Sequence, residues 1–297
     1  MTNNVLNWLL EDENPAIKYR TLTELNDKNP ADYQDCYNKI WEQKQIKKLL
    51  SKQDSNGLWG MKDIRDISSI QILMAFAEYG LSKDERIDKY AEFIISKMKE
   101  WKHNDIDVFT CYAPISLRSL VMLGYHDRSD VAELISVFVE TQIYDGGFMC
   151  KRMLDKKPKR KSCYKAATDA LFLYAECKRN NILPDNSENL VNYFLGREVF
   201  YSTDKTKTFI DTHGVPKGFG PMKIGIPLFV ASLAILGEGN NHILQKTWAM
   251  MEERKNEHGR FRAEGAASQP GIFGKDGHEN KWSTFYALLA EKYRYAK

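Results

Sequence analysis

The sequence contains no run of about 18 apolar residues, which is the length that a membrane-spanning helix needs. The opening segment, MTNNVLNWLLEDENP, lacks the basic start and the long apolar stretch of a secretory signal peptide. These two absences argue against a membrane protein and against a secreted one. We therefore expect a cytoplasmic protein with no membrane span.

Cysteine is scarce and odd in number: the chain has five, at Cys36, Cys111, Cys150, Cys163 and Cys177. Small secreted domains use many paired cysteines as a disulfide framework. In a chain without a secretion signal, free thiols or metal ligands are the expected roles.

Net charge is also small. Lysine and arginine number 43 and aspartate and glutamate 40, so the formal charge is +3. This balance argues against a strongly basic nucleic-acid-binding protein. The 43% of hydrophobic and 28% of charged residues are typical of a globular protein, and not of a collagen or a disordered tail. A chain of this length can bury roughly 75% of its unfolded surface, so its core does not need disulfides or structural metal ions for stability.

Strand signals are few, whereas helical periodicity extends over most of the chain. Ile67, Ile70, Leu73, Met74 and Ala77, for example, follow the spacing of three and four residues that places side chains on one helical face. Glycine, proline and Asn/Asp clusters separate such stretches. This pattern predicts helices at 3–11, 15–27, 33–53, 66–80, 84–101, 108–124, 128–142, 163–178, 185–198, 223–237, 240–255 and 281–295.

The predicted helices form six consecutive pairs, and the second helix of a pair tends to be the more apolar. This favours an outer layer of first helices and an inner layer of second helices. A repeat of this kind cannot bury its apolar face alone, and closing the array into a ring removes the exposed ends. We therefore predict an all-α fold, an α6/α6 toroid of two concentric rings of six helices, as one domain over residues 1–297.

The turns within three of the pairs share a pattern: a helix end, a polar turn, a glycine, and an aromatic residue shortly after it. The segments are KQDSNGLWG (52–60), TQIYDGGFMC (141–150) and RKNEHGRFRAEG (254–265). Their glycines, Gly57, Gly146 and Gly259, can adopt the positive φ that ends a helix. We expect Trp59, Phe148 and Phe261 to fold back over the helix ends.

These turns resemble the repeats of a known superfamily. Gln53-x-x-x-Gly57-x-Trp59 and Gln142-x-x-Asp145-Gly146-Gly147-Phe148 are similar to the Q-x-x-x-G-x-W and D-G-G-F repeats of squalene cyclases and protein prenyltransferase β-subunits. The whole chain also resembles small bacterial single-toroid proteins, through Trp8-Leu9-Leu10, Asn14-Pro15, Tyr19-Arg20, Gly259-Arg260-Phe261 and Lys281-Trp282-Ser283-Thr284. The resemblance implies an α/α toroid with a central cavity. It assigns no activity, because that small group has no established one.

Asp105 and Asp107 are the acidic candidates. In a toroid, the start of each inner helix lies at one mouth of the cavity, and both residues lie just before the inner helix predicted at 108–124. Class II terpene cyclases carry a D-x-D-D motif at a similar place, whose central Asp protonates an alkene. Here Val108 occupies the last position, so the group that would strengthen the acid is missing. The alternative role for Asp105 or Asp107 is helix N-capping.

Cys111, Cys150 and Cys163 are the metal candidates, because each lies at or near the start of an inner helix or after the turn before one. Three thiolates and a fourth ligand, His213, His278 or water, would complete a tetrahedral zinc site. Prenyltransferase β-subunits and lanthionine cyclases hold zinc with Cys and His in similar toroids. The Asp-x-Cys pattern of the prenyltransferases and a C-x-x-C pair are both absent here, and small buried thiols filling helix junctions are the alternative.

The segment KRMLDKKPKRK (151–161) carries seven cations and one acid, and we expect it to be a loop. It predicts an anion-binding surface at the cavity mouth, for a diphosphate, a nucleotide or a nucleic-acid backbone, with a solvated charged loop as the alternative. Two irregular segments, 208–225 and 263–282, also precede inner helices and would act as lids. The predicted binding residues are Tyr112, Tyr164, Arg160, Lys161, Lys217, Arg260, Arg262 and Lys281.

Three functions remain open. The first is a prenyltransferase- or cyclase-like protein, an enzyme or a former one, that binds a mainly apolar small molecule, phosphorylated or not, in an aromatic-lined cavity. The second is a non-catalytic scaffold that binds a peptide or nucleic-acid partner through the 151–162 loop. The third is a glycan-processing toroid that uses a pair of carboxylates. The first predicts convergent polar groups at one mouth, and the second a conspicuous basic surface.

Overall fold

The structure, a computed structural model, describes residues 3–59, 67–157, 159–210, 224–264 and 273–296. The chain divides into two compact units. Unit 1 comprises Met1–Tyr37 and Ser187–Lys297, and unit 2 comprises Asn38–Asn186. The single domain over 1–297 stays a prediction.

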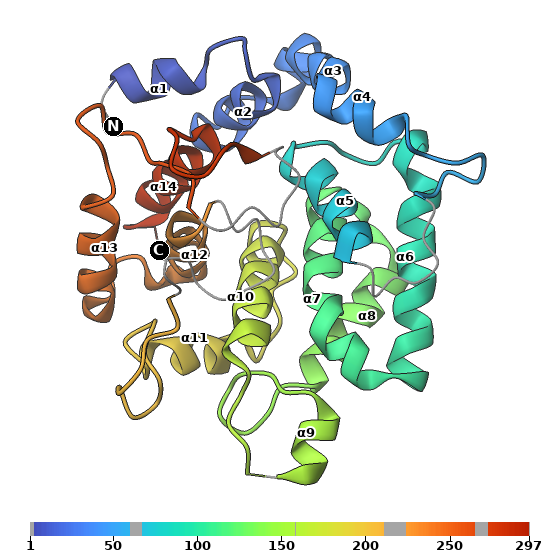
Figure 1. The fold of residues 1–297 in the computed structure, drawn as a ribbon, viewed down its shortest axis with the longest axis vertical. Helices are drawn as coiled ribbons and strands as arrows, with labels where there is room; N and C mark the ends of the chain where they lie inside the picture. Colours follow the sequence, from blue (N-terminus) through green and yellow to red (C-terminus); the bar gives the residue numbers. More distant parts are fainter. Residues whose placement is uncertain (1–2, 60–66, 158, 211–223, 265–272, 297) are drawn as a thin grey trace. The chain divides into compact units, whose positions relative to one another are not determined.

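In unit 2 most of the packing involves α7 (Ile106–Met122). This helix packs against α5 (Ile67–Glu78), α6 (Glu85–Asn104), α8 (Ser129–Glu140) and α10 (Tyr164–Arg179), which surround it in Figure 1. The shorter helices of this part of the chain are α4 (Lys44–Leu50), η3 (Tyr125–Asp127) and α9 (Lys151–Lys156), and α3 (Gln34–Glu42) contains the boundary between the units.

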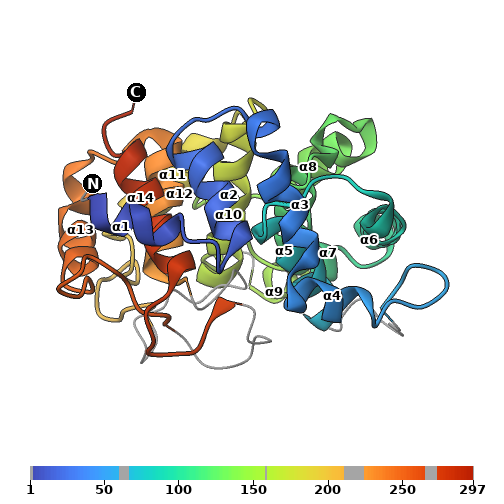
Figure 2. The ribbon, with the colours of Figure 1, turned by 90° about the horizontal axis from the view of Figure 1, so that it is seen from above.

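In unit 1 the main contact is between α12 (Ile226–Leu233) and α14 (Lys281–Tyr293), which lie side by side in both Figure 1 and Figure 2. α14 also contacts α2 (Pro15–Arg20) and η1 (Thr21–Leu25). The remaining helices of the unit are α1 (Asn3–Leu9), η2 (Pro30–Tyr33), α11 (Ser187–Leu195), η4 (Ala234–Glu238), η5 (His242–Leu244) and α13 (Gln245–Glu252).

The all-α prediction is confirmed. Each of the twelve predicted ranges contains a helix or two consecutive ones, and the described residues form isolated β-bridges but no strand. Two details differ. The range 33–53 breaks at Gln43, whose backbone is extended. Ile40 and Ile46 are both buried, although residues six apart do not share a helical face, and the break lets both reach the core.

The second difference concerns the basic segment, which was expected to be a loop throughout. Its first six residues form the helix α9. Met153 and Leu154 are half-buried and give this short helix an apolar side. The high density of charge on both sides of these two residues hides this signal in the sequence.

The predicted contrast within helix pairs is confirmed by burial. In α8, the first helix of its pair, 4 of 12 residues are buried, whereas in its partner α10 13 of 16 are buried. Every residue of α12 is buried. The second helices therefore form the cores of the two units.

Three turns have the same backbone geometry. In each turn, the N–H of the first residue donates to the carbonyl of the residue four positions later. The N–H of the glycine, three positions after the first residue, donates to the carbonyl of that first residue. The donor and acceptor pairs are Asp54–Leu58 and Gly57–Asp54, Ile143–Gly147 and Gly146–Ile143, and Asn256–Arg260 and Gly259–Asn256, at 2.7–3.0 Å. The three glycines have φ values of 77°, 84° and 73°, which an L-residue adopts only at a cost.

Glutamine side chains brace the two turns of unit 2 in the same way. Gln53 Nε2 donates to the Gly57 carbonyl at 2.8 Å, and Gln142 Nε2 donates to the Gly146 carbonyl at 2.8 Å. The aromatic residues fold back as expected: Trp59 Nε1 donates to the carbonyl of Leu49 in α4 at 2.6 Å. Phe148 and Phe261 are buried. The sequence repeat is thus a structural repeat, with a side chain that closes the turn on itself.

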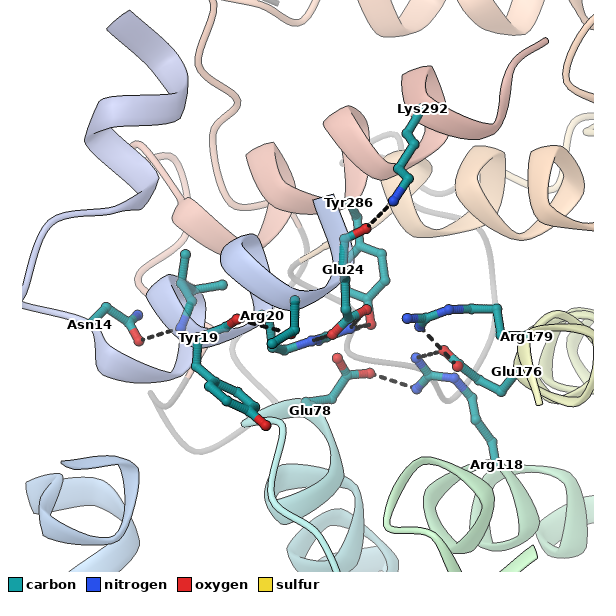
Figure 3. A network of polar contacts seen from close by, with 12 residues as sticks. Asn14, Tyr19, Arg20, Glu24, Glu78, Arg118, Glu176, Arg179, Tyr286 and Lys292 are labelled. Carbon is teal, nitrogen blue, oxygen red and sulfur yellow. Dashed lines mark hydrogen bonds and ion pairs between the residues drawn. The ribbon is translucent and has the colours of Figure 1, made fainter. Parts of the chain in front are cut away.

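Buried ion pairs tie helices together within each unit (Figure 3). In unit 2, Arg118 of α7 lies 2.6 Å from Glu78 of α5 and 3.6 Å from Glu176 of α10, and the three side chains are 4%, 0% and 6% exposed. In unit 1, Arg20 of α2 pairs with Glu24 and donates to the hydroxyl of Tyr286 in α14 at 3.3 Å. Removing one charged side chain from such a cluster leaves an opposite charge buried without compensation.

Among the described residues, no helix is both long enough and apolar enough to cross a membrane.

Candidate functional site

Two of the predicted metal ligands are in direct contact. The sulfur of Cys111, in the second turn of α7, lies 3.1 Å from the sulfur of Cys150, the N-cap residue of α9. Both cysteines are half-buried, and neither forms a disulfide. Cys150 follows the Gly146 turn, which ends at Gly147, three residues before it.

Cys163 belongs to the same cluster. It is the N-cap residue of α10, and its N–H donates to the carbonyl of Phe148 at 2.8 Å. This bond closes the segment 149–162 into a loop whose two ends lie side by side. Cys163 lies close enough to Cys111 for its charge to act on that thiol. Cys163 therefore lies in the same part of unit 2 as Cys111 and Cys150, and the role of the three cysteines as metal ligands stays a prediction.

The Cys111 thiol keeps its proton in this setting. The sulfur–sulfur hydrogen bond with Cys150 raises the pKa of Cys111 most, and burial and the charge of Cys150 raise it further. Lys165, in the first turn of α10, opposes this effect. Either sulfur can be the donor of this hydrogen bond, and the raised pKa favours the protonated form of Cys111 at neutral pH.

The contact bears on the zinc prediction. Two thiolates on one tetrahedral zinc lie about 3.8 Å apart, given a Zn–S distance of about 2.3 Å. Cys111 and Cys150 would therefore have to separate to bind one ion. No group of three or more metal-binding side chains is found among the described residues, and His213 lies outside them. Zinc stays a prediction that elemental analysis of the reduced protein can test.

The two acidic candidates flank the start of α7. The carbonyl of Asp105 accepts from the N–H of Phe109 at 3.0 Å, so Asp105 occupies the position just before the helix. Asp107 lies in the first turn, and both residues are half-buried. Asp107 is four residues before Cys111, so the two side chains share one face of α7. Their catalytic role stays a prediction.

Two predicted binding aromatics flank the thiols. Tyr112 is half-buried, and its ring centroid lies 6.3 Å from that of Trp101 in α6. Tyr164, the first residue of α10, is 5% exposed and packs in the core of unit 2. Of the two, Tyr112 retains the surface that a ligand can reach.

The basic segment carries an exposed group of cations, which we call the basic cluster: Lys156, Lys157, Lys159, Arg160 and Lys161. None of their side chains forms an ion pair with any described residue. The segment is nevertheless held in place. The hydroxyl of Tyr144 donates to the carbonyl of Lys159 at 2.8 Å, and Ser162 donates its N–H to the carboxylate of Asp145 at 3.0 Å. The Gly146 turn therefore anchors the basic cluster beside Cys163.

Two of the remaining predicted cations, Arg260 and Lys281, lie in unit 1 and have acidic partners. Arg260 pairs with Glu279 at 2.8 Å, and Lys281 pairs with Glu11 at 2.8 Å. Both also lie over the ring of Trp8, at 4.3 and 5.3 Å from its centroid, and so attach α1 to the rest of the unit.

Arg262 is exposed and forms a β-bridge with Glu279. Lys217 and His213 lie outside the described residues, as do most of the predicted lid 208–225 and residues 265–272 of the predicted lid 263–282. A binding role for these cations of unit 1 stays a prediction.

Two features of unit 2 were not predicted from the sequence. The first is the buried pairing of Arg118, which has no local signal because its partners come from helices far away along the chain. The second is a groove of about 630 Å³ between α8 and the segment 182–186. Its apolar walls include Ile135 and Leu183, and its polar residues include His126, Glu140 and Asp185.

Comparisons of the chain with protein-family models, with curated proteins and with solved structures found no match.

Proposed function

We propose that the helical hairpins form an α6/α6 toroid of the squalene cyclase and prenyltransferase β-subunit kind. The repeated turn supports this proposal. The same two backbone hydrogen bonds recur at Gly57, Gly146 and Gly259, and the same glutamine brace recurs in the two turns of unit 2. A repeated connection sets a repeated angle between consecutive helices, which is what a closed ring of hairpins requires.

We further propose that the protein binds a mainly apolar small molecule with an anionic end, at the thiol-bearing face of unit 2. The basic cluster carries this proposal: five exposed cations without an acidic partner among the described residues, held against the turn that also positions Cys150 and Cys163. Some exposed cations of unit 2 pair across helices, as Lys99 does with Asp130, whereas the basic cluster places five cations, unpaired among the described residues, within six consecutive positions. Unpaired cations that the fold anchors in place are suited to a phosphate or diphosphate.

The chemistry near the anionic end would come from the start of α7. Asp107 and Cys111 share a face of that helix, and Tyr112, whose ring lies near the buried Trp101, offers aromatic surface for the apolar part. A cyclase would use Asp107 as its acid, and a transferase would use a thiol as its nucleophile. Ligand binding is the proposed function that both share.

The probe is farnesyl diphosphate, titrated into the purified full-length protein by calorimetry, with farnesol and inorganic pyrophosphate as separate arms. We expect the intact diphosphate to bind more tightly than either fragment. Replacing the five residues of the basic cluster with Ser should weaken binding at least tenfold and reduce its salt dependence.

The matched control removes five other exposed cations from unit 2, Lys39, Lys44, Lys48, Lys52 and Lys89, so that both variants lose the same charge. Equal affinity in the two variants would refute the role of the basic cluster. Binding of a single-stranded oligonucleotide, without binding of farnesyl diphosphate, would instead favour the scaffold that acts through the 151–162 segment.

A further inference from the structure

The direct contact of Cys111 and Cys150 is not accounted for by the proposed ligand binding or by zinc. Ligand binding at the basic cluster does not need it, and a shared zinc ion would hold the sulfurs farther apart. The two residues are 39 positions apart in the chain, and separate elements, α7 and the junction before α9, bring them together. Such an approach of two thiols is the starting geometry for a disulfide.

Neither residue of the pair is fully buried. Cys111 and Cys150 are half-buried, whereas Cys177 is buried. Attack on a disulfide needs a thiolate, so exchange at this pair should be faster at pH values above neutral.

We propose that Cys111 and Cys150 form a redox-modification site, a dithiol that a small-molecule disulfide of the glutathione class oxidises to an intramolecular disulfide. One thiolate of the pair attacks a sulfur of the small disulfide R–S–S–R. The S–S bond of the reagent breaks, a mixed disulfide forms on the protein, and one thiolate RS⁻ leaves.

The second cysteine gives its proton to solvent and attacks the protein-bound sulfur of the mixed disulfide. The Cys111–Cys150 bond forms and a second RS⁻ leaves. Two electrons pass from the cysteine pair to the reagent, which becomes two molecules of RSH once the protons are returned.

The bond would tie α7 covalently to the residue from which α9 begins. In the reduced protein the Gly146 turn and the Phe148–Cys163 hydrogen bond hold this segment. Oxidation would add a link at its other side and fix the start of the basic segment against the core of unit 2.

The test begins with the full-length protein, reduced and freed of metal with a chelator, and then incubated with oxidised glutathione. Free thiols are blocked with N-ethylmaleimide and the tryptic peptides are analysed by mass spectrometry. We expect a cross-linked pair of peptides that contains Cys111 and Cys150, a mass lower by about 2 Da, and two fewer maleimide adducts per chain. Failure of this cross-link under conditions that oxidise a dithiol reference peptide would overturn the proposal.

Single variants identify the pair. Cys163→Ser is the matched control because it removes the third thiol of the cluster, and it should form the cross-link at the wild-type rate. Cys111→Ser and Cys150→Ser should lose the cross-link and retain one glutathione on the remaining cysteine. A cross-link that contains Cys163 in the wild-type protein would refute the assignment. This measurement uses the wild-type protein alone, so it does not depend on whether a variant folds.

Discussion

Replacing Arg118 with Met should destabilise the protein by about 3–5 kcal/mol, the cost that follows when one partner of a buried ion pair is removed. Arg118 touches two carboxylates, but the loss falls mainly on one of them. Glu176 keeps Arg179 at 3.1 Å, whereas the 2.6 Å partner of Glu78 disappears and the side chain of Glu78 is 0% exposed.

The magnitude can be checked by a second route. A glutamate that loses its buried counter-charge can take up a proton to remain in the core. At pH 7 this costs about 3.7 kcal/mol for an ordinary glutamate with a reference pKa of about 4.3, at 1.36 kcal/mol per pH unit. The cost is largest at neutral pH and shrinks as the pH falls towards that reference value, because the unfolded chain then carries the proton as well.

The assay is urea unfolding followed by circular dichroism at pH 7 and again near pH 5. Arg128→Met is the matched control: Arg128 also contacts two carboxylates in unit 2, but its side chain is 29% exposed, so we expect a loss of less than about 1 kcal/mol. The double variant Glu78→Gln/Arg118→Met should regain most of the stability, since no buried charge is left unpaired. A loss for Arg118→Met as small as that of Arg128→Met, or one that grows at low pH, would refute the reasoning.

Three further outcomes are expected. Gly146→Ala should lower the unfolding free energy by about 1–2 kcal/mol, because φ there is 84°; an unchanged denaturation midpoint would contradict the strained-turn argument. Burial, with the charge of Glu176, raises the pKa of Cys177 to about 12, so iodoacetamide at pH 8 should modify it only after unfolding, and native-state labelling at the rate of a free thiol would oppose this. Hydrogen bonds from Ser202 and Thr206 lower the pKa of Asp204 to about 2. Its contribution to stability is therefore complete above the unfolded value near 3.8 and is lost as the pH falls through about 2; a carboxyl ¹³C titration midpoint near 3.8 would disprove it.

The helices could be predicted from the sequence because their burial follows a period that the chain itself displays. α10 is the clearest case, with an apolar core face and a polar turn before it. α9 could not, since two half-buried apolar residues between clusters of cations give no readable period. The break at Gln43 follows from how two neighbouring faces share one core, and that arrangement is absent from any local window of sequence.

The candidate site divides in the same way. That the segments of Cys150 and Cys163 lie near each other was predictable, because both belong to the connection between α8 and α10. The 3.1 Å contact with Cys111 was not, since it depends on how α7 packs on α10. The charge of Arg260 and Lys281 was visible in the sequence, but their acidic partners and the ring of Trp8 between them were not.

The discontinuity of unit 1 has a consequence for synthesis. Unit 2 is one uninterrupted stretch, so its core can form as soon as residue 186 has left the ribosome. The first 37 residues are made earlier but find their partners last: Arg20 must wait for Tyr286, 266 positions later. The amino-terminal segment therefore spends most of translation without its own core, and it is the part of the nascent chain that most needs protection.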